Sequence, residues 1–249
     1  MKKMLLSIIC ICILQMAYAE NGSSLWLRYE QGNQSEIYSN KNTPTLQTAI
    51  QVLKEAWKGA PVTLTIRKNP SLKEDGFTIH TQKEKICITS PTDKGILYGA
   101  YHLLRLQSLN TPLEQALPIT ENPAFSVRIL NHWDNLDGTI ERGYAGQSLW
   151  QWEELPHKLS PRYEAYARAN ASIGINGTVL NNVNASPQIL SAPYLLKVKA
   201  LADVFRPYGI KVYLSVNFAS PMVLDSLSTA DPLNKEVARW WKNKAKEIY

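Results

Sequence analysis

The chain has 249 residues, of which 45% are hydrophobic and 19% are charged, and its formal net charge is +6. This composition provides enough apolar material for a sizeable core, and it contains no low-complexity tract or internal repeat. The basic residues are dispersed, so the charge gives no reason to expect a nucleic-acid partner.

The first nineteen residues have the composition of an export signal. Lys2 and Lys3 give a positive start, Met4–Met16 is apolar, and Ala17-Tyr18-Ala19 has the pattern of a signal cleavage site. The apolar run is too short to span a bilayer. We therefore expect an exported protein, periplasmic or extracellular, that is cleaved near Ala19 and has no membrane span in its mature form.

Cysteine usage sets a limit on how the mature protein is held together. Cys10 and Cys12 lie in the predicted signal, which leaves Cys87 as the one cysteine of the mature chain. An intramolecular disulfide is then impossible, and the fold must depend on packing. We find no cluster of metal-ligating residues and no cofactor motif, so neither a metal nor a cofactor is expected.

Residues 20–118 are predicted to form a small α+β domain. Apolar residues recur at helical spacing in two stretches, and three others have strand-like composition. Thr45 follows Pro44 and is the expected N-cap of the first helix; Thr92 or Asp93 is expected to cap the second. The expected elements are helices at Thr45–Lys58 and Thr92–Leu109, and strands at Leu25–Tyr29, Val62–Lys68, Phe77–Gln82 and Ile86–Thr89.

Residues 119–127 are predicted to be a linker, because the surrounding stretch is rich in proline and lacks periodicity. From Arg128 onward the chain repeats strand, loop and helix, which predicts a parallel sheet with right-handed crossovers. A doubly wound sheet and a (β/α)₈ barrel fit this pattern about equally. The expected strands are Ile129–Leu130, Gly177–Leu180 and Lys211–Val216, and the expected helices are Pro161–Ile173, Ser191–Tyr208 and Asn234–Tyr249.

The first of these strands ends in an unusual cluster of polar and aromatic residues. Such a cluster at a strand's carboxyl end is typical of a ligand-binding loop. Carboxylates and amides can bind sugar hydroxyls, and a tryptophan face packs on the apolar face of a pyranose. The alternative is a capped, solvated loop with one structural tryptophan. The cluster comprises Asn131, His132, Trp133, Asp134, Asn135 and Asp137.

The block NHWDNLDGTIERGYAGQSLW, at residues 131–150, resembles the segment that opens the catalytic barrel of the α-glucuronidases of glycoside hydrolase family 67. Those inverting, exo-acting enzymes remove glucuronic acid or its 4-O-methyl ether, α-1,2-linked to xylose, from xylan-derived oligosaccharides. The resemblance implies that residues 128–249 are the first part of a (β/α)₈ TIM barrel. A complete barrel needs about 250 residues, so the chain is expected to be an N-terminal fragment. A homodimer of the full-length protein is left open.

A second, less specific resemblance lies in the helix around Gly95-Ile96-Leu97-Tyr98-Gly99-Ala100 and Leu103-Leu104-Arg105. It is similar to the last helix of a non-catalytic domain that precedes the barrel in several glycosidase families, including hexosaminidases. This similarity favours a glycosidase without choosing among the families.

No catalytic residue is assigned. Glycoside hydrolysis uses two carboxyl groups, and the resemblance implies that the general acid lies in a Ser-Glu-Gly-Gln-Pro motif, which this sequence lacks. The base carboxylates would follow later still. Asp134, Asp137 and Glu141 are interpreted as structural hydrogen-bond acceptors, because Arg142 and the loop amides would keep them ionised. The chain alone is therefore predicted to be inactive.

Five residues are predicted to bind substrate. By resemblance, Trp133 lies against the bound glucuronate and Val183 lies near the substituent at O4. Asn182 and Asn217 follow predicted strands, and for them pocket lining and loop structure are equally favoured. Arg142 could pair with a uronate carboxylate.

Some alternatives stay open at this point. Arg142 could instead form a structural pair with Glu141 or Asp137. At the level of the whole protein, one alternative is a non-catalytic carbohydrate-binding or scaffold protein, and another is a hexosaminidase-like glycosidase.

Overall fold

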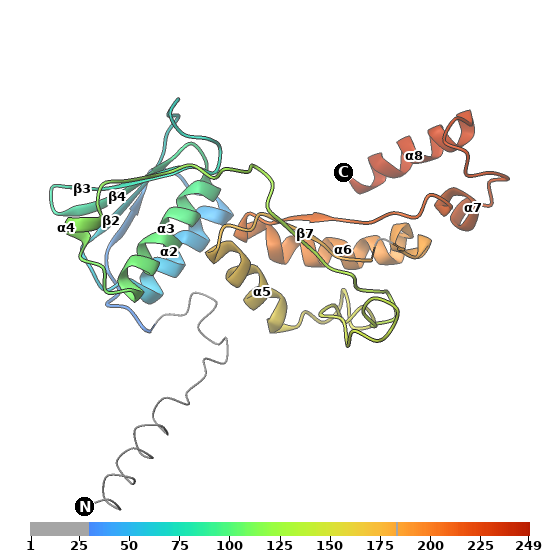
Figure 1. Ribbon diagram of the computed structural model, residues 1–249, viewed down its shortest axis with the longest axis horizontal. Helices are drawn as coiled ribbons and strands as arrows, with labels where there is room; N and C mark the ends of the chain where they lie inside the picture. The colour runs from blue at the N-terminus through green and yellow to red at the C-terminus, as the bar shows by residue number, and fades with distance from the viewer. Residues whose placement is uncertain (1–29, 183) are drawn as a thin grey trace, which may run out of the picture.

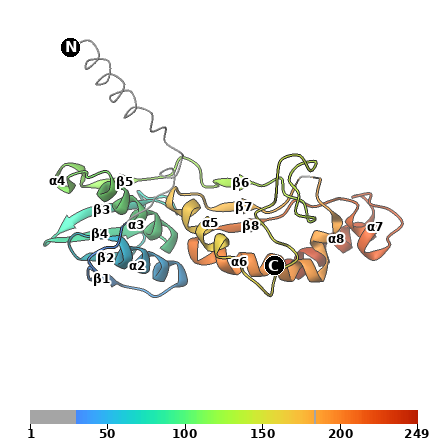
Figure 2. The same ribbon diagram turned by 90° about the horizontal axis from the view of Figure 1, so that it is seen from below.

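The computed structural model describes residues 30–182 and 184–249. The predicted signal, the strand predicted at Leu25–Tyr29, and Val183 lie outside the described residues. The described chain builds two β-sheets that follow one another in sequence, each accompanied by helices (Figure 1; Figure 2). Among these residues, no helix is both long and apolar enough to cross a membrane.

The first sheet has five strands in the order β1-β2-β4-β3-β5. β1, β2 and β4 run parallel, whereas β3 is antiparallel to both of its neighbours. Helices α2 and α3 lie side by side against this sheet (Figure 1). The elements are β1 (Ile37–Ser39), α2 (Pro44–Ala56), β2 (Val62–Ile66), β3 (Phe77–Gln82), β4 (Lys85–Ser90), α3 (Asp93–Ser108), α4 (Leu113–Ala116) and β5 (Ile119–Glu121).

The starts of α2 and α3 show what local sequence can and cannot determine. Thr92, one of the two predicted alternatives, caps α3: its hydroxyl oxygen accepts a hydrogen bond from the Gly95 N–H. α2 begins one residue earlier than predicted, because Pro44 occupies the first turn and Thr43 accepts the Leu46 N–H. A proline suits that first position, where no intrahelical donor is needed. Thr45 as the cap was therefore wrong.

Close packing of α3 on the sheet explains its glycines. A Cβ at Gly95 would collide with the Ser90 hydroxyl, and one at Gly99 would press on Ile88. Both positions lie where the helix crosses β4 or its end, so a larger side chain would push the two layers apart.

The predicted linker differs from the structure at its start. Ile119–Glu121 forms β5, which pairs antiparallel with β3 in the register Phe77 to Glu121. Three residues are too few to display a strand periodicity, so pairing with a distant strand decides this element.

The second sheet is parallel, with strand order β6-β7-β8, as predicted. The helix that follows β7 continues into a 3₁₀ turn and ends at Gly209, whose φ of 70° is left-handed. α7 was not predicted; β7 and β8 are shorter than expected, and β6 is one residue longer. The elements are β6 (Ile129–Asn131), α5 (Pro161–Ser172), β7 (Gly177–Val179), η1 (Pro187–Leu190), α6 (Ala192–Phe205), η2 (Arg206–Tyr208), β8 (Lys211–Tyr213), α7 (Ser220–Asp225) and α8 (Lys235–Ile248).

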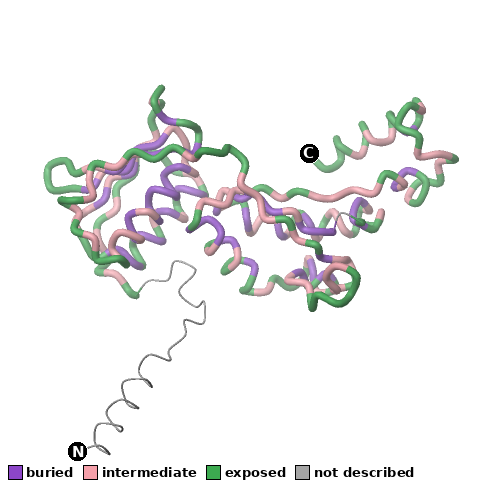
Figure 3. The backbone as a smooth tube through the Cα atoms, viewed as in Figure 1, coloured by how far each residue is buried: buried purple, intermediate pink, exposed green. Residues whose placement is uncertain are grey.

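A continuous hydrophobic core joins the two sheets. Buried residues concentrate in α2, α3, α5 and β4 (Figure 3). Beneath the second sheet, Trp150 packs against Tyr163, Tyr166 and Phe205, with ring centroids 5.4–5.9 Å apart. Such aromatic packing stabilises the core beyond its buried area.

A buried carboxylate, that of Asp75, also ties the two sheets together. Its Oδ2 lies 2.8 Å from Arg128 Nη2 and accepts the Asn176 side-chain N–H at 3.0 Å, while Oδ1 lies 3.1 Å from Lys94 Nζ. Burial of Asp75 favours its neutral form, but Arg128, Lys94 and Asn176 together hold the pKa of this carboxyl below its usual value. Asp75 precedes β3, whereas Arg128 and Asn176 precede β6 and β7.

We expect Asp75→Asn to lower the free energy of unfolding by about 3 kcal/mol at pH 7, because two cations lose a buried partner. The folded-state pKa of Asp75 is depressed, so its contribution is fully present above the unfolded-state pKa of about 3.9 and disappears as the pH falls through the folded-state pKa. Urea unfolding at pH 7 and pH 3 should show the two proteins converging at low pH. Glu74→Gln is the control, since Glu74 is largely exposed and its 3.3 Å pair with Lys94 should contribute below about 1 kcal/mol.

Candidate active-site wall

The carboxyl ends of β6, β7 and β8 all run into polar loops. Because the three strands are parallel, these loops meet at one edge of the sheet. The backbone joins them there: the Asn182 N–H, after β7, donates to the Asp134 carbonyl, after β6, at 2.7 Å. The Asn181 side chain exchanges two hydrogen bonds of 2.8 Å with the Ser215 backbone, after β8.

The loop after β6, residues 132–148, forms an irregular hairpin that we call the Trp133 loop. Asp134 pairs with Ile140 and Thr139 with Gln147 in isolated antiparallel bridges. The Glu141 N–H donates to the Trp133 carbonyl at 2.9 Å. These contacts within its own backbone help to hold the loop in shape.

The side chain of Asp134 anchors this loop. It is buried, accepts the Ser148 hydroxyl at 2.5 Å and the Leu149 N–H at 3.2 Å, and lies 3.6 Å from His132 Nδ1. Burial alone would raise the pKa of this carboxyl, but the contacts with His132, Ser148 and Leu149 hold it below the usual value. Asp134 therefore acts as the structural acceptor that the sequence predicted.

A chain of hydrogen bonds between side chains, which the sequence did not predict, supports the Trp133 loop. His132 Nε2 lies 2.7 Å from the Tyr166 hydroxyl, which lies 2.9 Å from Thr178 Oγ1. Burial raises the pKa of Tyr166 to about 12, so it stays protonated. Trp150 packs on the His132 ring with centroids 5.1 Å apart. Tyr166 lies on α5, and no local pattern marks it as a partner of β6.

Trp133 and Arg142 extend outward from the anchored loop. Trp133 is 43% exposed, at the carboxyl end of β6. Arg142 is exposed and forms no ion pair with any described residue. The alternative pairing of Arg142 with Glu141 or Asp137 is therefore wrong: the Asp137 carboxylate instead accepts the backbone N–H and hydroxyl of Thr139.

The two predicted asparagines are both bound into loop structure. Asn182 is buried, and its side-chain N–H lies 3.3 Å from Asn135 Oδ1 and 3.5 Å from the Glu141 carbonyl. Asn217 donates to the Ala185 carbonyl at 3.2 Å and accepts the Ala219 N–H at 2.8 Å. Contact of either amide with a ligand stays a prediction, as does the role of Val183.

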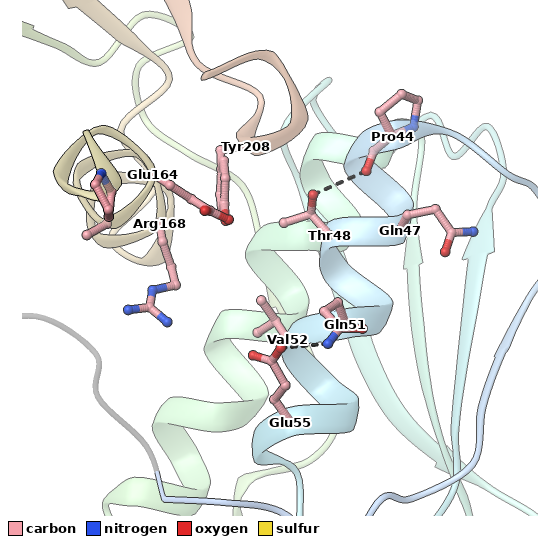
Figure 4. A pocket seen from close by; sticks show the side chains of 11 residues that line it. Pro44, Gln47, Thr48, Gln51, Val52, Glu55, Glu164, Arg168 and Tyr208 are labelled. Carbon is pink, nitrogen blue, oxygen red and sulfur yellow. Dashed lines mark hydrogen bonds between the residues drawn. The ribbon is translucent and has the colours of Figure 1, made fainter. Parts of the chain in front are cut away.

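A groove of about 520 Å³ lies elsewhere, between α2 and α5 (Figure 4). Its walls are mostly polar, and the Tyr208 hydroxyl in it donates to Glu164 at 2.9 Å. None of the residues predicted to bind substrate lines it. Within residues 30–182 and 184–249, no group of His, Cys, Asp and Glu side chains is placed to hold a metal ion.

Comparison with known families identifies the chain. The model of the glycosyl hydrolase family 67 middle domain matches residues 108–249, and that of the family 67 N-terminus matches residues 61–103. The chain belongs to glycosyl hydrolase family 67. The resemblance inferred from residues 131–150 is therefore confirmed.

Curated relatives of this family member are named as alpha-glucuronidases. A probable alpha-glucuronidase A of Aspergillus clavatus is 42% identical over 181 residues, which cover 72% of this chain and 21% of that protein. An alpha-glucuronidase of Hypocrea jecorina is 41% identical over 185 residues, covering 72% of this chain and 22% of the relative. The chain thus spans about a fifth of the length of these relatives.

Solved structures with a similar fold are glycosidases. A family GH115 4-O-methyl-alpha-glucuronidase with specificity for decorated arabinogalactans matches with a TM-score of 0.56 and 14% identity, over 88% of this chain and 34% of the other. A GH138 enzyme targeting pectin rhamnogalacturonan II also has a TM-score of 0.56, with 16% identity, over 84% of this chain and 28% of that one. At this identity the likeness concerns the mixed α/β fold.

We expect Asp134→Ala to lower the free energy of unfolding by about 2–4 kcal/mol, because the Ser148 hydroxyl and the Leu149 N–H lose their buried acceptor. Asp137→Ala, in the same loop but exposed, should change it far less. Chemical denaturation of both variants tests this. Equal effects would contradict the anchoring role of Asp134.

Proposed function

We propose that the chain is the N-terminal part of an inverting, exo-acting α-glucuronidase. The enzyme would remove (4-O-methyl)-D-glucuronic acid that is α-1,2-linked to xylose in xylan-derived oligosaccharides. Membership of family 67 supports this reaction class. The observation that carries the proposal is the half-exposed Trp133, held at the carboxyl end of β6 by a loop anchored through buried Asp134. A mostly buried tryptophan facing the core would not offer a sugar a stacking surface.

The proposed architecture is the first part of a (β/α)₈ barrel, residues 128–249, after an accessory domain at residues 20–118 and a linker at 119–127. Three parallel strands with intervening helices support it. Among the strands that the structure describes, β6 and β8 each pair with β7 alone. In a closed barrel, further strands would pair with both free edges.

Each of the five residues predicted to bind substrate has a proposed role. Trp133 would stack on the pyranose, and the free guanidinium of Arg142 would pair with the uronate carboxylate. Val183 would contact the O4 substituent, and Asn182 and Asn217 would shape the loops around it. The general acid and base would be supplied by sequence beyond residue 249, and export by residues 1–19.

The runner-up is a non-catalytic carbohydrate-binding protein that uses the same wall. A hexosaminidase-like glycosidase is disfavoured by the family 67 match over residues 108–249. The two remaining functions differ in whether catalytic carboxylates follow Tyr249.

The test combines the gene and the assay. We expect the reading frame to continue past Tyr249 into a Ser-Glu-Gly-Gln-Pro motif. The full-length protein should then release 4-O-methylglucuronic acid from aldouronic oligosaccharides, and the isolated 249-residue chain should release none, because it would lack both the general acid and the general base that inversion needs. A stop codon after Tyr249, or turnover by the 249-residue chain, would falsify this assignment.

Trp133→Ala in the full-length protein should lower kcat/KM about 10-fold to 100-fold, because the sugar loses an apolar surface to cover. The free energy of unfolding should change by less than about 1 kcal/mol, since the side chain is half exposed. Steady-state kinetics and thermal denaturation measure the two effects. Phe125→Ala is the control: this exposed aromatic residue precedes β6, at the opposite end of the strand, and its removal should leave kcat/KM unchanged.

A further inference from the structure

Most polar side chains of the Trp133 loop are already occupied by the protein. Asp134 accepts from Ser148 and Leu149, and Asp137 accepts from Thr139. Asn135 donates to the Thr139 hydroxyl at 3.0 Å and to the Glu141 carbonyl at 2.7 Å, and it faces the Asn182 amide. Asp134 and Asn135 therefore have little capacity left for a ligand, whereas exposed Asp137 uses only its Oδ1.

The Glu141 carboxylate differs from these groups, and its predicted role as a structural hydrogen-bond acceptor is wrong. It takes part in no hydrogen bond or ion pair within the described part of the chain, although the residue is partly buried. An ionised carboxylate has two oxygens that only accept hydrogen bonds. Both carboxylate oxygens of Glu141 are therefore available to accept hydrogen bonds from a ligand, and sugar hydroxyls can donate such bonds.

The backbone of Glu141 contacts two of the predicted substrate-binding residues. Its N–H donates to the Trp133 carbonyl at 2.9 Å, and its carbonyl lies 3.5 Å from the Asn182 side-chain N–H. The bridge between Asp134 and Ile140 puts Trp133 and Glu141 opposite one another in the hairpin. Residues opposite one another in an antiparallel pair have Cβ atoms about 5 Å apart.

The conformation of Glu141 is also unusual. Its φ is 58°, in the left-handed region that residues other than glycine seldom adopt. The amides of Asn135 and Asn182, both directed at its carbonyl, hold it there. Conformations of this kind persist where surrounding contacts fix them, and they are frequent at ligand clamps.

We propose that Glu141 is a specificity-determining residue whose carboxylate accepts hydroxyl hydrogen bonds from the pyranose that stacks on Trp133. The inference rests on the proposed function and deepens it. Arg142, the next residue, would take the charged group of the same sugar. A uronic acid carries both features, hydroxyl donors and a carboxylate, so adjacent Glu141 and Arg142 match its two kinds of polar group. Charge-assisted bonds of this type are stronger than neutral ones.

The test compares Glu141→Ala and Glu141→Gln with Glu153→Ala in the full-length protein, using an aldouronic oligosaccharide. Glu153 is an exposed glutamate after Trp152 with no partner in the described chain. We expect KM to rise at least about tenfold in Glu141→Ala, with kcat nearly unchanged. Glu141→Gln, which keeps a neutral acceptor, should lie between Glu141→Ala and the unmodified protein. The melting temperature should not fall, because the backbone contacts of residue 141 remain.

Two results would overturn the proposal. The first is that Glu141→Ala and Glu153→Ala have equal kinetics. The second is that Glu141→Ala lowers kcat and the melting temperature but leaves KM unchanged, which would indicate a structural role. Calorimetric titration with D-glucuronic acid separates this proposal from the proposed function. If the unmodified protein shows no turnover but binds glucuronic acid, and Glu141→Ala binds it at least about tenfold more weakly, the proposed function fails and the role of Glu141 stands. If the unmodified protein shows no turnover and glucuronic acid binds neither it nor Glu141→Ala, both proposals fail.

Discussion

The Trp133 loop depends on the buried carboxylate of Asp134. This carboxylate accepts hydrogen bonds from the Ser148 hydroxyl and the Leu149 N–H. A loop that carries free polar and aromatic side chains has little core of its own. It therefore needs fixed points inside the protein, and a buried ionised carboxylate with several donors is a strong one. The depressed pKa of Asp134 is the electrostatic expression of this arrangement. The anchor is what allows Trp133 to be both exposed and fixed.

A second buried carboxylate fixes the other end of the same strand. Arg128 immediately precedes β6 and pairs with Asp75 of the first sheet, while Asp134 follows β6 by three residues. β6 has only three residues, so its own backbone hydrogen bonds stabilise it weakly. The two carboxylates thus hold a short strand between the core that joins the sheets and the loop that faces outward. The ion pair between Arg128 and Asp75 thus orients β6. Through this strand the first sheet influences the Trp133 loop without contacting it.

The sequence predicted those parts of the molecule that local patterns determine. The parallel order of β6, β7 and β8 followed from repeated strand and helix patterns, and the Trp133 cluster was recognisable in one contiguous block. The partners of the site residues could not be predicted, because they lie far away along the chain: Asn182 and Asn135 are 47 residues apart, and His132 and Tyr166 are 34 apart. β5 was missed for the same reason, since a three-residue strand is determined by its partner β3 and not by its own periodicity.

These partners divide the polar groups of the Trp133 loop into two sets with different physical consequences. Asp134, Asn135 and Asn182 are buried or partly buried and bonded within the protein, so removing one leaves donors or acceptors unpaired and affects stability. The side chains of Glu141 and Arg142 form no hydrogen bond or ion pair with residues that the structure describes, so their hydrogen-bonding capacity is available to a ligand. Two amides, those of Asn135 and Asn182, are directed at the Glu141 carbonyl and hold this residue in a left-handed conformation. The free pair of Glu141 and Arg142 belongs to the same loop as exposed Trp133, which is the arrangement that the proposed sugar-binding role needs.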